Sequence, residues 1–148
     1  MTSSDLQGLY QELILDHSRS PHGYGLRGET TAQSHQVNPT CGDEITLQVH
    51  LGADGRLEAV AWEGHGCAIS QASASLFAEL VEGMELADVE QRIDVFREAM
   101  RSRGKIEPDP ELLGDAAALG GVSRYVARVK CAMLAWVAAE DALRKRDS

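Results

Sequence analysis

The sequence predicts an α+β protein in which a small antiparallel β-sheet of about three strands is covered by helices on one face. Two patterns support this fold class. Residues 45–51 alternate between apolar and polar side chains, as a half-buried strand does, and a second strand-like run follows a turn. From residue 68 onward the pattern is helical, and strands that precede helices favour helices packed against one sheet.

The first part of the chain combines one helix with the expected strands. Apolar residues three and four apart predict a helix over about residues 5–18, which Ser3 or Ser4 can cap. Gly52 and Gly55 flank a hairpin turn signal between the last two strand-like runs. The expected strands cover about residues 29–37, 45–51 and 57–62.

The second part of the chain is expected to be helical. In the last segment, apolar residues that include Val129, Met133 and Trp136 recur near one helix face. The 148 residues, of which 43% are apolar, suffice for one domain over residues 1–148 with a sizeable core. The expected helices cover about residues 68–81, 86–101, 110–119 and 123–145.

Charge and cysteine content narrow the classes of function. The formal net charge is −9, which is a poor match for phosphate backbones, so no nucleic-acid partner is expected. No apolar run approaches the length of a membrane span, and the first residues do not resemble a signal peptide. The protein is therefore expected to be cytoplasmic. There its three cysteines would stay reduced and serve as metal ligands, nucleophiles or core residues.

Cys41 and Asp43 lie two residues apart in the segment 38–43, which reads Asn-Pro-Thr-Cys-Gly-Asp. Gly42 between them lets the backbone turn so that both side chains can face one point. This local setting favours exposed ligands. The alternatives are a small apolar filler at Cys41 and an ordinary turn residue at Asp43.

The other two cysteines differ in their surroundings. Cys67 follows Gly-His-Gly and precedes a predicted helix, whose N-terminus stabilises a thiolate; like Asp43, it is expected to be exposed, and a buried cysteine is the alternative. Cys131 lies in an apolar stretch of the last helix, where a cysteine is more often core than ligand. The cysteine spacings match no compact zinc finger, and His65 is the competing metal ligand. Even so, three thiolates and a carboxylate are a complete donor set for tetrahedral zinc.

Four long segments in this order resemble the SufU family, relatives of the IscU scaffolds within the IscU/NifU-like superfamily of iron–sulfur cluster assembly. The segments are residues 9–17, 38–43, 64–75 and 128–136. IscU scaffolds typically have His directly before the last cysteine, where this chain has Lys130, and residues 86–113 hold an expected insertion. Both features indicate the SufU branch. Val126 departs from the family, since many relatives are expected to have proline there.

The resemblance implies a zinc-dependent sulfurtransferase that accepts persulfide sulfur from a SufS-type cysteine desulfurase, a PLP enzyme. It also implies a sulfur acceptor at Cys41 and downstream Suf scaffold proteins as further partners. Arg128 and Lys130 are expected to orient the site or to meet an acidic partner surface, with ordinary surface charge as the alternative. The implied zinc ligands are Cys41, Asp43, Cys67 and Cys131.

Two other functions are compatible with the sequence. One is a scaffold on which a transient iron–sulfur cluster is assembled on the same ligands, because thiolates suit such clusters as well as zinc. Lys130 argues against it, since an ammonium group is a poor metal ligand. The other is a structural zinc module, against which stands a core large enough to fold without metal.

Overall fold

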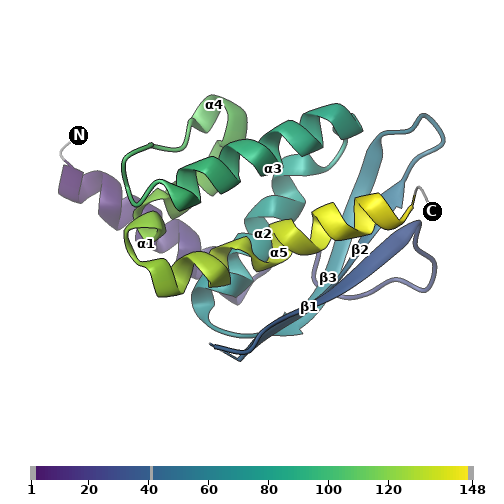
Figure 1. Cartoon of the computed structure of the whole chain (residues 1–148), viewed down its shortest axis with the longest axis horizontal. Coiled ribbons are helices and arrows are strands. Elements are labelled where there is room, and N and C mark those ends of the chain that lie inside the picture. The colour runs from purple at the N-terminus through teal and green to yellow at the C-terminus, as the bar shows by residue number, and fades with distance from the viewer. Residues whose placement is uncertain (1–2, 41, 147–148) are drawn as a thin grey trace.

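A computed structural model describes residues 3–40 and 42–146, with side chains from residue 11 onward. The arrangement is the expected α+β fold, with three strands in one sheet and the helices on one side of it (Figure 1). In chain order the elements are α1 (Ser3–Arg19), β1 (Ala32–Asn38), β2 (Asp43–Leu51), β3 (Leu57–His65), α2 (Ala68–Val81), α3 (Leu86–Arg101), α4 (Pro110–Leu113), the 3-10 helix η1 (Gly114–Arg124) and α5 (Val126–Lys145).

The sheet has the simplest antiparallel order, β1-β2-β3. Asn38 at the end of β1 pairs with Asp43 at the start of β2, so only four residues connect these strands. The β2–β3 hairpin turns at the predicted glycines, where the Gly52 N–H donates to the Arg56 carbonyl over 2.9 Å. Both connections are short because antiparallel neighbours need only a tight turn.

One face of the sheet forms the core. The side chains of Leu47, Val49, Val60 and Trp62 alternate onto this face and are buried. Helix α5 packs along β1 and β2, and α2 packs beside it against β3 (Figure 1). The prediction of helices on one sheet face is therefore confirmed.

The opposite face is partly covered by the segment between α1 and β1. Gln48 on this face is buried, because its side-chain amide bonds both the N–H and the carbonyl of Arg27, at 2.9 and 3.0 Å. Burial, and then the nearby Arg27 charge, lower the pKa of His50 below its ordinary value of 6.5. This face is thus polar but not freely solvated.

Helix α2 is nearly enclosed because small residues let its neighbours approach closely. Ser73 is fully buried; its hydroxyl donates to the Ala132 carbonyl over 2.6 Å and accepts the Trp136 indole N–H over 2.9 Å. The Trp136 ring in turn stacks on Phe96, with ring centroids 3.9 Å apart. These contacts fix α2 and α5 relative to each other, and both helices carry a predicted cysteine ligand.

The predicted element boundaries agree best with the structure where glycines or a regular apolar period mark them in the sequence. Helices α2 and α3 have the predicted limits, whereas β1 begins at Ala32 rather than near residue 29. The segment expected as one helix over 110–119 is a short α4 followed by η1, because Gly114 ends α4 with a φ of +54°. Helix α5 begins at Val126 rather than 123, since Tyr125 has extended backbone. Among the described residues, no helix combines the length and apolarity needed to cross a membrane.

Candidate metal centre

Asp43 lies on the core face at one end of the sheet. It shares strand parity with Ile45 and Leu47, so its side chain points toward the helices, and it is fully buried. One carboxylate oxygen, Oδ1, accepts the Cys67 backbone N–H over 2.9 Å. The other, Oδ2, is buried and has no hydrogen-bond partner among the described residues. The prediction that Asp43 is exposed was wrong, because the carboxylate occupies a position of the buried alternation.

Cys67 is the N-cap residue of α2 and is half-buried. The preceding Gly66 has to be a glycine, because a Cβ there would collide with Asp43 Oδ1 and Ser70 Oγ. The Ser70 hydroxyl donates to the Cys67 carbonyl over 3.0 Å and lies 4.0 Å from the Cys67 sulfur. Gly66 therefore lets the aspartate of β2 and the first turn of α2 approach each other.

Cys131, on the second turn of α5, lies close to Asp43 and Cys67. Its side chain is 1% exposed. The Asn38 side-chain amide donates toward its sulfur over 3.9 Å, and the sulfur lies 3.9 Å from the Ala127 carbonyl. Cys131 is thus a core residue and also lies beside the other candidate ligands, so the two alternatives that the sequence presented do not exclude each other.

The ligating atoms of Asp43, Cys67 and Cys131 all lie within 4.8 Å of one another. We call these three residues the cysteine–aspartate centre. They come from β2, the N-terminus of α2 and α5, so the sheet and two helices hold them in place. Two sulfurs and a carboxylate suit zinc, and the unpartnered Asp43 Oδ2 is a buried acceptor that a cation would satisfy. The residues present therefore fit a zinc ion.

Cys41 lies outside the described residues, and only its sequence neighbours constrain it. Two peptide units separate it from Asp43, so their Cα atoms can be at most about 7 Å apart. Next to it, Gly42 has a φ of +74°, and its N–H donates to the Asn38 carbonyl over 2.9 Å. The described part of the candidate centre therefore consists of Asp43, Cys67 and Cys131.

The auxiliary residues lie on the outside of the centre. Arg128 and Lys130 are exposed on the first turns of α5 and form no ion pair with another described side chain. His65, the competing ligand, is exposed at the end of β3 and is not part of the described donor set that converges with Cys67. Sequence reasoning missed Asn38 and Ser70, although their positions beside Cys41 and Cys67 offered a signal.

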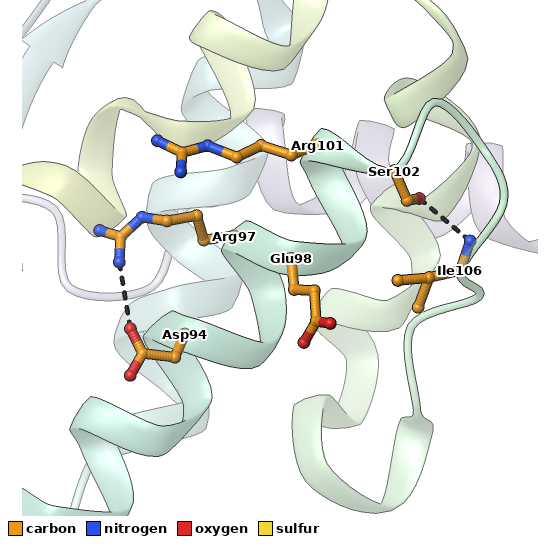
Figure 2. A pocket seen from close by; sticks show the side chains of 6 residues that line it. All are labelled: Asp94, Arg97, Glu98, Arg101, Ser102 and Ile106. Carbon is orange, nitrogen blue, oxygen red and sulfur yellow. Dashed lines mark hydrogen bonds and ion pairs between the residues drawn. The ribbon is translucent and has the colours of Figure 1, made fainter.

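A separate open groove of about 300 Å³ lies along α3 and the turn that follows it (Figure 2). Its charged groups are of both signs, and Arg97 is already paired with Asp94 at 3.1 Å and Glu140 at 2.8 Å. None of the predicted site residues lines it. The lining residues are Asp94, Arg97, Glu98, Arg101, Ser102 and Ile106.

Comparison with known families identifies the class of protein that this fold and centre represent. The model of the NifU-like N-terminal domain matches residues 9–144. The chain therefore belongs to the NifU-like N-terminal domain family, as the four sequence segments indicated.

Curated relatives match over nearly the whole chain. The zinc-dependent sulfurtransferase SufU of Bacillus subtilis (strain 168) is 37% identical, covering 98% of this chain and 96% of the relative. The iron–sulfur cluster assembly scaffold protein IscU of Streptococcus pyogenes serotype M1 is 38% identical, covering 98% of this chain and 89% of the relative. The resemblance to SufU within the IscU-like group is thereby confirmed.

Solved structures agree with the fold. A putative iron–sulfur cluster assembly scaffold protein for the SUF system (FiSufU), from Fervidobacterium islandicum AW-1, superposes with a TM-score of 0.79 at 32% identity. That match covers 93% of this chain and 98% of the other. A hypothetical protein solved at 2.3 Å superposes with a TM-score of 0.84 at 35% identity, over the same shares.

Proposed function

We propose that this protein accepts and transfers persulfide sulfur in iron–sulfur cluster assembly, and that it is a zinc-dependent sulfurtransferase. The observation that carries the proposal is the convergence of Asp43, Cys67 and Cys131 within 4.8 Å, with an unpartnered carboxylate oxygen at the same place. The near full-length similarity to a zinc-dependent sulfurtransferase supports it.

Zinc would be held by the cysteine–aspartate centre together with Cys41. A zinc ion bound there keeps its thiols deprotonated at neutral pH and brings no redox chemistry of its own. The protein positions the donors in advance: Asp43 is fixed by the Cys67 N–H, and Cys131 is fixed in a packed helix. Such preorganisation leaves little ordering entropy to lose on binding.

Cys41 is proposed as the sulfur acceptor because the other three ligands are anchored in regular elements. Its thiolate would attack the outer sulfur of a persulfide carried by the partner. A new S–S bond forms on Cys41 as the partner's S–S bond breaks, and the partner's cysteine leaves as a thiolate. One sulfur atom moves, and no electrons are gained or lost overall.

The proposed partner is a SufS-type cysteine desulfurase, a PLP enzyme that generates the persulfide. We propose that Arg128 and Lys130 meet an acidic surface of this partner; their exposure on the α5 turns that carry Cys131 supports this. Sulfur would then pass to downstream Suf scaffold proteins. We place the protein in the cytoplasm, where its thiols stay reduced.

The second candidate function is a scaffold for a transient iron–sulfur cluster. It is favoured by relatives named as scaffolds, including one of Thermotoga maritima that is 38% identical and covers 93% of this chain. Thiolates and a carboxylate suit iron as well as zinc. Lys130 speaks against it, because the residue before Cys131 offers no ligand at neutral pH.

One experiment separates these functions. The zinc-loaded protein is incubated with a SufS-type desulfurase and cysteine for a single turnover, and peptide mass spectrometry locates the added sulfur. We expect one extra sulfur on Cys41 with zinc retained, and none on the Cys41→Ser variant. Wild-type acceptance by Cys41→Ser would overturn the acceptor role. Absent sulfur together with a transferable cluster after anaerobic reconstitution would favour the scaffold.

A further inference from the structure

A second set of metal-ligating side chains lies toward the other end of α2. One ligand atom each from His17, Glu79 and Asp115 lies within 4.8 Å of the others. The three residues come from the last turn of α1, from α2 and from the start of η1. Glu79 lies twelve positions after Cys67, which is about 18 Å along a helix. We call His17, Glu79 and Asp115 the distal cluster.

His17 is oriented by a group outside the cluster. Its Nδ1 lies 2.7 Å from the hydroxyl oxygen of Ser75, which is fully buried. The same oxygen accepts the His22 backbone N–H over 2.7 Å. A serine oxygen has two acceptor lone pairs, so it can also accept an Nδ1–H of His17. That tautomer leaves Nε2 unprotonated, which is how metal-bound histidines are commonly held.

The separation between the donors fits a shared cation better than a direct bond. His17 Nε2 and Glu79 Oε2 are 3.7 Å apart, which is too long for a hydrogen bond. Two ligands about 2.1 Å from a tetrahedral ion are about 3.4 Å apart, close to this value. The histidine side chain is only 12% exposed, whereas that of Glu79 is 50% exposed, so the cluster opens to solvent on the carboxylate side.

The charge of the cluster has no local compensation among the described residues. The Asp115 side chain forms no hydrogen bond or ion pair with any of them, and the ion-pair partner of Glu79 among them is His17. By contrast, Glu82, one turn further along, is 2.7 Å from His22 Nε2 and forms a closed pair. Two carboxylates beside one neutral imidazole carry a local charge of −2, which attracts a cation.

We propose that the distal cluster is a second divalent-cation site, for a transition metal ion that accepts one imidazole and two carboxylates, such as Mn²⁺ or Zn²⁺. Imidazole and carboxylate donors suit these ions. The distal cluster has no sulfur donor, so its donor chemistry differs from that of the cysteine–aspartate centre. A bound ion would link α1 to α2 and η1. The proposal is independent of sulfur transfer.

Manganese is the probe, because it prefers oxygen and nitrogen donors and disfavours thiolates. The full-length protein, loaded with one equivalent of zinc per chain, is titrated with Mn²⁺, and free Mn²⁺ is followed by electron paramagnetic resonance. We expect one bound Mn²⁺ per chain, and at least about tenfold weaker binding for Glu79→Gln and for Asp115→Asn. The matched control is Glu82→Gln, which removes the same charge from the C-cap of the same helix and should bind as the wild type does.

A second readout does not depend on any substitution. At substoichiometric Mn²⁺, the imidazole NMR signals of His17 should broaden much more strongly than those of His22, because paramagnetic broadening falls steeply with distance from the ion. Equal broadening of both rings, or an equal loss of affinity in Glu82→Gln, would show that Mn²⁺ is attracted by general surface charge. Either result would overturn the proposed site. Cys67→Ser should lose zinc at the cysteine–aspartate centre yet retain the Mn²⁺ site, so failure of one proposal is distinguishable from failure of the other.

Discussion

The two donor sets along α2 differ in burial, in donor chemistry and in how they are held. The cysteine–aspartate centre is largely enclosed, with Asp43 and Cys131 almost fully buried, and it offers sulfur. The distal cluster combines one largely buried imidazole with two exposed carboxylates. Burial makes an unpaired charge costly and a bound cation correspondingly effective, whereas exposed carboxylates are screened by water. From this contrast we expect the proposed zinc ion to be held permanently at the first site, and the proposed cation at the second site to exchange readily.

The largest effect is expected from Cys67→Ser. Replacing a thiolate ligand by a hydroxyl should weaken zinc binding by more than about 100-fold, since even changes to groups behind the ligands cost roughly 10- to 100-fold. Equilibrium dialysis with metal quantification measures this. Retention of zinc at wild-type affinity would remove Cys67 from the ligand set.

Asp43→Asn should lower stability in the presence of zinc but not in its absence. In the zinc-loaded protein the loss of a charged ligand should lower both the zinc affinity and the melting temperature. In the metal-free protein the buried, unpartnered oxygen is already a cost, so a neutral amide should leave stability equal or higher. Thermal unfolding with and without a chelator tests both signs. A lower melting temperature under both conditions would show that Asp43 acts through protein contacts alone.

Gly66→Ala should loosen the cysteine–aspartate centre by steric conflict. The added methyl would collide with Asp43 Oδ1 and Ser70 Oγ, and such overpacking typically costs about 1–3 kcal/mol. Denaturant unfolding and zinc affinity should both decline. Gly28→Ala is the matched control, because a Cβ there meets nothing within 4 Å. Equal behaviour of the two variants would show that the close approach at Gly66 is not needed.

The smallest effect concerns a carboxylate that, unlike Asp115, is well partnered. Asp141 accepts the Ser34 hydroxyl over 2.6 Å and lies 3.0 Å from Lys145 Nζ. The Ser34 hydrogen bond, and then Lys145, hold the pKa of Asp141 below 3.8. Its stabilising contribution is thus present above pH 3.8 and is lost as the pH falls through the lower, folded-state pKa.

Asp141→Asn should therefore lower stability modestly at neutral pH and flatten the acid side of the stability–pH profile. Denaturant unfolding between pH 3 and pH 7 measures the profile. A parallel downward shift with an unchanged slope would assign the loss to packing rather than to ionisation. The same series on Asp115→Asn provides the comparison with a carboxylate that has no partner among the described residues.

Much of the fold could be predicted because periodicity and glycines act locally. The limits of α2 and α3 follow from regular apolar spacing, and the β2–β3 hairpin follows from its turn residues. The burial of Asp43 could also have been predicted, because Asp43 continues the alternation of Ile45 and Leu47. Its polar side chain instead suggested a turn residue. The acceptor role of Cys41 stays a prediction.

The distal cluster could not be predicted from sequence. His17, Glu79 and Asp115 are separated by 62 and 36 positions, and nothing local links them. Only the packing of α1 and η1 against α2 brings them together. For the same reason, Cys131 looks like an ordinary core residue until the tertiary structure places it beside Asp43.

The position of Asp43 two residues before Ile45 limits how the chain can change in length. Successive strand residues face opposite sides of a sheet, so one residue inserted between them would rotate the carboxylate onto the other face. An insertion in the hairpin at residues 52–55 would leave that orientation intact. Among homologous chains, insertions and deletions should therefore accumulate at the hairpin and avoid the start of β2.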